Sequence, residues 1–131
     1  GVRITGVSII DLDLTNPEGE PWDGLTQGDP DVYFRFFINE VEIENTENQP
    51  INGIGDESDL PTERLVFSDP IQLNNLAQSF SVEVWDDDGD TDELMASLPT
   101  TAIQTLATNE QSTLNLTDGQ TLLRFTLEYR R

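Results

Sequence analysis

The sequence contains no cysteine, no histidine and no lysine, and each absence removes a class of chemistry. Without cysteine and histidine there is no thiol nucleophile, no Ser-His-Asp triad, no Cys/His zinc site and no disulfide scaffold. Without lysine there is no Schiff-base chemistry. The carboxylates and hydroxyls that remain favour the binding of a hard cation such as calcium.

Positive charge is scarce as well. Six arginines stand against 26 aspartates and glutamates, which gives a net charge of −20 at pH 7 and a pI near 4.1. This balance excludes a basic footprint for nucleic acid and a polybasic patch for anionic membrane surfaces. Apolar runs are only a few residues long, so no transmembrane segment is expected. The length of 131 residues predicts a single domain, 1–131.

Strand-like alternation recurs along the whole chain. In the segment 31–38, for example, Val32, Phe34 and Phe36 share one face, and the segments 79–85 and 121–130 alternate in the same way. Weaker strands fit at 3–10, 40–44, 70–73, 93–97 and 112–116. Period-two patterns with one apolar face predict an all-β fold, an eight-stranded antiparallel β-sandwich. A short helix is expected within 100–107, with Thr100 as its cap and Ile103 and Leu106 facing the core.

Acidic residues gather in the connections between the predicted strands. The connections 11–29 and 45–68 are long, and the segment 86–93 has six carboxylates among eight residues. Two ionised carboxylates at about 5 Å and an effective dielectric near 20 repel by roughly 3 kcal/mol. Calcium uses such closely spaced oxygens, taking six to eight of them, whereas magnesium keeps more water. The alternative is a solvated acidic face that contributes only solubility.

The acidic segment is not an EF-hand loop. Counting from Asp86, Thr91 stands at position six, where that motif has glycine, and Ser97 replaces the terminal glutamate. Three stretches resemble the C2 domain instead. The stretch 22–34 resembles the first calcium loop of that family, and 84–96 resembles its third loop. The stretch 66–73 resembles the segment that precedes the strand leading into that third loop. The resemblance implies a C2-like sandwich of the circularly permuted, type-II-like topology, a divergent member and one module of a larger secreted protein.

The resemblance also implies a set of metal ligands for two or three Ca²⁺ ions between the loops 11–31 and 86–93. Loop one contributes Asp23 and Asp29. The acids Asp86 and Asp88 are the first two of the other loop, with the backbone carbonyl of Asp87 as a further oxygen. The third acid is Glu93 by position, or Asp92 because the loop is one residue shorter than usual, with Asp90 as an accessory ligand.

The function expected from these observations is that of a non-catalytic, calcium-binding module. It makes a calcium-dependent contact with a phospholipid membrane or a protein partner, or is a domain stabilised by calcium. The alternative is a carbohydrate- or protein-binding module with structural calcium, whose binding face would need exposed aromatic residues such as Tyr33, Phe37 and Trp85. A glycoside hydrolase needs paired carboxylates in a deep cleft, which acids on loops do not indicate. The acidity and the multi-acid site favour an extracellular location.

Overall fold

The computed structural model describes residues 1–20, 30–87 and 91–130. These residues form nine strands, one short helix and one 3-10 turn. In chain order the elements are β1 (Val2–Asp11), β2 (Val32–Ile38), β3 (Val41–Asn45), η1 (Glu57–Asp59), β4 (Leu65–Leu73), β5 (Ser79–Asp86), β6 (Glu93–Ser97), β7 (Thr101–Ala102), α1 (Ile103–Asn109), β8 (Thr113–Asp118) and β9 (Thr121–Tyr129).

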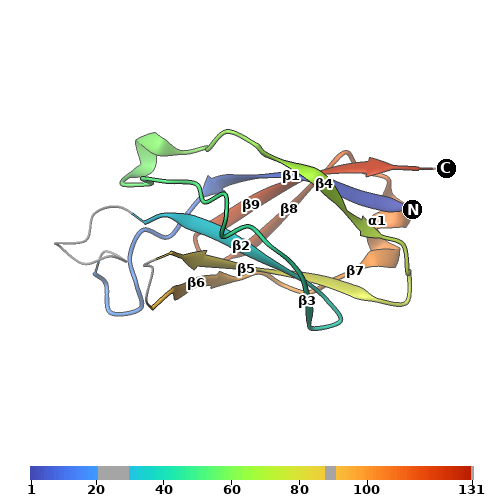
Figure 1. Ribbon diagram of the computed structural model, residues 1–131, viewed down its shortest axis with the longest axis horizontal. Helices are drawn as coiled ribbons and strands as arrows, with labels where there is room; N and C mark the ends of the chain where they lie inside the picture. The colour runs from blue at the N-terminus through green and yellow to red at the C-terminus, as the bar shows by residue number, and fades with distance from the viewer. Residues whose placement is uncertain (21–29, 88–90, 131) are drawn as a thin grey trace.

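The strands make two antiparallel sheets. One sheet has the order β4-β1-β9-β8, and the other has the order β3-β2-β5-β6 with β7 paired to β5. Figure 1 shows the two sheets packed along the long axis of the molecule, with both termini and α1 at one end. The all-β sandwich predicted from the sequence is therefore confirmed. Within the described segments, no helix has the length and apolar character needed to cross a membrane.

The core lies between the sheets and contains the inward side chains that the alternation predicts. Phe36 on β2 is fully buried, and its ring meets Phe80 on β5 at 6.1 Å, Phe67 on β4 at 5.4 Å and Phe125 on β9 at 6.4 Å between centroids. One ring thus contacts three other strands from both sheets. Aromatic pairs of this kind add about 0.5–1.5 kcal/mol beyond the burial of their area.

Three local predictions differ from the structure. β4 begins at Leu65 rather than at residue 70, and it contains Pro70. Proline is tolerated there because β4 is an edge strand whose pairing with β1 shifts register between Ile4 and Gly6. The helix begins at Ile103 after Ala102, which has no side-chain cap, so Thr100 is not its cap; the predicted burial of its two apolar residues is confirmed. The ninth strand, β7, was not predicted, because its two residues are too few to show an alternating pattern.

The antiparallel order places the start of β2, the end of β5 and the start of β6 at the same end of the sandwich. β2 and β5 pair so that Val32 lies opposite Asp86, and β5 and β6 pair so that Asp86 lies opposite Glu93. These three strand ends lie at the end of the sandwich opposite the termini, which we call the rim (Figure 1). The described ends of the two acidic connections, at Val32, Asp86 and Glu93, therefore lie close together.

Truncating the central ring should test this arrangement. We expect Phe36→Ala to lower the free energy of unfolding by about 3–5 kcal/mol, because it removes a fully buried aromatic side chain and leaves a cavity between the sheets. Urea unfolding monitored by circular dichroism measures the change. The control is Val41→Ala on β3, where the side chain is 64% exposed and the expected loss is under about 0.5 kcal/mol. Equal losses in both variants would contradict the assigned core.

Candidate metal centre

The end of β5 is attached to the start of β2 by hydrogen bonds on both sides of Asp31. The Asp31 amide donates to Asp86 Oδ1 at 3.2 Å, and the Asp87 amide donates to the Asp31 carbonyl at 2.8 Å. The Asp31 side chain in turn accepts from the Gly53 amide at 3.1 Å. Asp86 is fully buried, so its carboxylate serves this connection inside the protein. The effect is to hold Asp87 at the rim of the sheet.

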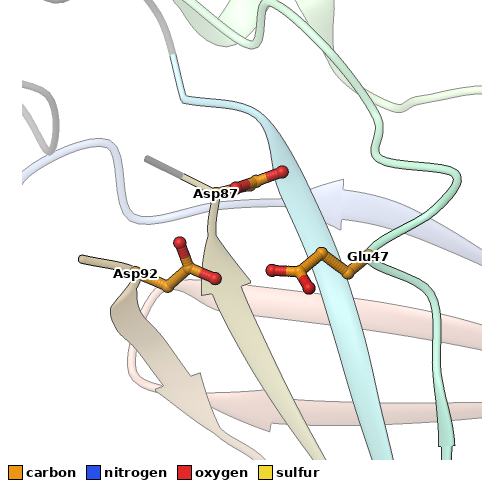
Figure 2. Close-up of side chains that lie close together, drawn as sticks. All are labelled: Glu47, Asp87 and Asp92. Carbon is orange, nitrogen blue, oxygen red and sulfur yellow. The ribbon is translucent and has the colours of Figure 1, made fainter. Parts of the chain in front are cut away.

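A second segment reaches the same rim by running alongside β2, on the side where β3 pairs with it. After β3 ends, Thr46 pairs with Phe34: its amide donates to the Phe34 carbonyl at 2.9 Å, and its hydroxyl accepts from the Phe34 amide at 2.9 Å. Ile51 and Val32 then exchange two backbone hydrogen bonds of 2.7 and 2.9 Å. Glu47 lies between these two attachments. From this position beside β2, the Glu47 side chain points toward the end of β5 (Figure 2).

Three carboxylates converge at this rim. One oxygen each from Glu47, Asp87 and Asp92 lies within 4.8 Å of the other two. Figure 2 shows the three side chains turned toward one another, with Asp87 following β5, Asp92 preceding β6 and Glu47 coming from the segment after β3. Glu47 is exposed and the two aspartates are half-buried, so the group is open to solvent.

The electrostatics of the group favour a bound cation. A hydrogen bond with Asp92 raises the pKa of the Glu47 carboxyl, with smaller contributions from burial and from the negative charges of Asp92 and Asp87; the Arg35 charge opposes this rise. Ionising Glu47 therefore costs free energy in the folded protein. A divalent cation would remove that repulsion and invert the local potential. The donor set consists of carboxylate oxygens, which fits calcium and lacks the softer ligands that transition metals prefer.

The structure places the sequence-predicted ligands in three groups. Asp87 and Asp92 are in the three-carboxylate group, Asp87 with its side chain rather than only its backbone carbonyl. Asp86 is buried and bonded to the Asp31 amide, and Glu93 lies opposite it as the first residue of β6. Asp23, Asp29, Asp88 and the accessory Asp90 lie outside the described residues.

Sequence reasoning missed Glu47. It stands in the long connection 45–68, with no neighbouring acid that marks a loop motif, and 40 residues before Asp87. The only local signal is Thr46, whose hydroxyl and amide both bond to Phe34. A turn-forming residue of this kind does not reveal which strand the segment lies against. The position of Glu47 follows from tertiary structure alone.

Tyr33 borders the carboxylate group from beneath. It is fully buried, and its hydroxyl donates to Asp92 Oδ2 at 2.6 Å while accepting from the Arg35 guanidinium at 3.3 Å. Burial, followed by the bond to Asp92, raises the pKa of Tyr33 to about 12, although Arg35 acts in the opposite direction. The guanidinium of Arg35 also lies over the Trp85 ring at 4.3 Å.

The aromatic residues proposed for a sugar- or protein-binding face are largely covered. Tyr33 is fully buried, Phe37 is half-buried, and Trp85 is half-buried beneath Arg35 with its indole N–H bonded to Glu83 at 3.0 Å. Phe37 and Trp85 retain some exposure, but the three rings do not form an open aromatic platform.

Comparisons with known proteins support the fold. Neither the protein-family models nor the curated protein sequences give a match. Among solved structures, the chain is similar to a calcium-bound structure of two C2 domains of extended synaptotagmin 2, with a TM-score of 0.61 and 16% identity. The match covers 97% of this chain and 44% of that chain, so this domain spans less than half the length of that protein chain. The protein therefore has a C2-like β-sandwich fold, which confirms the resemblance indicated by the sequence motifs.

The environment of Tyr33 predicts a delayed ionisation. In the single-tyrosine variant Tyr129→Phe, we expect Tyr33 to ionise with a midpoint near pH 12 rather than 10, because burial and Asp92 both favour the neutral phenol. Ultraviolet absorbance of tyrosinate measures the midpoint. Above pH 10 the unfolded chain releases this proton and the folded chain keeps it, so the free energy of unfolding should fall as the pH rises toward 12. An ordinary midpoint near 10 would contradict the buried hydrogen bond.

Proposed function

We propose that the protein is a non-catalytic, calcium-binding C2-like module whose described ion site is formed by Glu47, Asp87 and Asp92. The observation that carries the proposal is the convergence of these three carboxylates within 4.8 Å at the rim where β2, β5 and β6 meet. The structural comparison supports it: the fold is C2-like, and the solved C2 structure that it resembles is calcium-bound.

The three carboxylates supply at most six oxygens, whereas calcium takes six to eight. We therefore propose that further oxygens come from the acids in the connections 11–31 and 86–93, for two or three ions in total. Asp88 follows Asp87 directly, and Glu93 follows Asp92. The remaining proposed ligands are Asp23, Asp29 and the buried Asp86.

Calcium would act by changing the sign of the local charge. In its absence the clustered carboxylates repel one another and any anionic surface, since the chain carries a net charge of −20. Bound ions neutralise the rim and keep coordination positions for outside oxygens. The proposed output is a calcium-dependent contact with an anionic partner, either a phospholipid headgroup or an acidic protein. An extracellular location, where calcium is abundant, remains part of this proposal.

Thermal unfolding tests the ion site. With calcium at a hundredfold excess over its dissociation constant, we expect a stabilisation of about 2.7 kcal/mol, which for a domain of this size raises Tm by roughly 10 °C over the value in EDTA. The comparison is repeated with magnesium at the same concentration, for which a smaller rise is expected. The variant that removes the site combines three substitutions: Glu47→Gln, Asp87→Asn and Asp92→Asn. It should lose most of the calcium-dependent rise and be at least as stable as the native chain in EDTA, because the repulsion is gone.

A second triple variant controls for the change in net charge. It neutralises three exposed glutamates outside the proposed ligand set: Glu40→Gln, Glu57→Gln and Glu63→Gln. This variant should keep the full calcium-dependent rise in Tm. If both triple variants lose it equally, or if magnesium stabilises the native chain as strongly as calcium, the acids only bind counterions diffusely and the proposed site is wrong.

A further inference from the structure

We propose that Tyr33 is a positioning residue that orients the calcium ligand Asp92 from beneath the site, an inference that rests on the proposed calcium-binding function. Tyr33 is fully buried on β2, opposite Trp85 on β5. Its hydroxyl lies 2.6 Å from Asp92 Oδ2. Asp92 itself precedes β6, so this bond attaches a residue of the connection between β5 and β6 to the rigid centre of the sheet.

The direction of the hydrogen bond follows from Arg35. A phenol has one proton, and a guanidinium can only donate. Because Arg35 donates to the Tyr33 oxygen at 3.3 Å, that oxygen acts as the acceptor there, and its own proton is available for Asp92. In the chain of hydrogen bonds from Arg35 through Tyr33 to Asp92, each group therefore donates to the next. This chain of bonds ends on Oδ2 of Asp92, one of the three carboxylates that converge at the rim.

Arg35 is itself fixed in place on the outer side of the sheet. Its guanidinium lies over the Trp85 ring at 4.3 Å, and its Nε lies 3.6 Å from Glu42 on β3. The indole N–H of Trp85 bonds to Glu83 at 3.0 Å. Side chains from three strands of one sheet, β2, β3 and β5, thus hold the Arg35 guanidinium, which orients the Tyr33 hydroxyl. The orientation of Asp92 is built into the sheet rather than left to the loop.

A positioning bond of this kind changes metal affinity without touching the metal. The bond to Tyr33 uses one lone pair of Oδ2 and restricts rotation of the Asp92 carboxylate. The remaining lone pairs of that carboxylate stay available to coordinate the ion. Partners of metal ligands in other proteins typically change affinity by about 10- to 100-fold when they are removed. Tyr33→Phe removes only the hydroxyl and keeps the buried ring. We expect it to weaken calcium binding by about 10-fold.

The chain offers a matched control in its second tyrosine. Tyr129 is half-buried on β9, and its hydroxyl donates to the Leu106 carbonyl of α1 at 2.9 Å, at the end of the molecule with the termini. Tyr129→Phe also deletes one tyrosine hydroxyl and one hydrogen bond. Calorimetric titration with calcium chloride should give a native dissociation constant in Tyr129→Phe and an approximately tenfold larger one in Tyr33→Phe.

A spectroscopic readout separates positioning from loss of stability. The chain has two tyrosines, so Tyr33 is the only one in Tyr129→Phe. Adding calcium to that variant should shift the near-ultraviolet tyrosine band, because the acceptor of the Tyr33 hydroxyl gains a cation. This measurement leaves Tyr33 intact, so it remains informative even if Tyr33→Phe does not fold.

The outcomes distinguish the two proposals. If the native chain does not bind calcium, the proposed function fails and the role of Tyr33 fails with it. If the native chain binds calcium but Tyr33→Phe binds it equally well, or both tyrosine variants weaken binding to the same extent, only the positioning role is overturned. An unchanged tyrosine band in calcium-loaded Tyr129→Phe would overturn it as well.

Discussion

The register between β2 and β5 is the constraint on which the rest of the candidate site depends. Val32 lies opposite Asp86, and the backbone around Asp31 bonds to both Asp86 and Asp87. Because side chains alternate with period two, a shift of one residue would move every inward ring of β2 to the outer face and carry Asp87 away from the rim. The same pairing that buries the core therefore sets where the acidic connection begins. Core packing and site geometry are coupled through one strand pair.

The site places like charges close together on a rigid support. Glu47, Asp87 and Asp92 lie close together, and the pKa of the Glu47 carboxyl is raised by its hydrogen bond with Asp92, then by burial and by repulsion from the negative charges of Asp92 and Asp87. Arg35 offsets part of this repulsion, and Tyr33 directs a hydrogen bond to Asp92. A rim that the sheet holds in place and that gathers three carboxylates suits the proposed calcium site.

Much of the fold could be predicted because alternation is a local property of the chain. The segments around Phe36, Val82 and Phe125 each show one apolar face, and all three residues are buried between the sheets. The start of β4 could not be predicted in the same way. Pro70 argues against a strand, and it is tolerated only because β4 lies at an edge, a fact of sheet order rather than of sequence. The prediction that Thr100 caps α1 was wrong for a similar reason. Residues 101–102 pair with β5 as strand β7, and the helix starts after them.

By itself the sequence determined the all-β class, the C2 resemblance and the concentration of acids in 86–93, because composition and short-range spacing are local properties of the chain. Asp87 and Asp92 follow from that spacing, since both stand in one short connection between paired strands. Only the tertiary structure brought Glu47 to them, through a segment that runs alongside β2 and is held there by the hydrogen bonds of Thr46 and Ile51. The same holds for Tyr33, since strand pairing and the covering Arg35 turn an aromatic candidate for a binding face into a buried hydrogen-bond donor. Contacts between distant segments depend on register and packing, which no local pattern specifies.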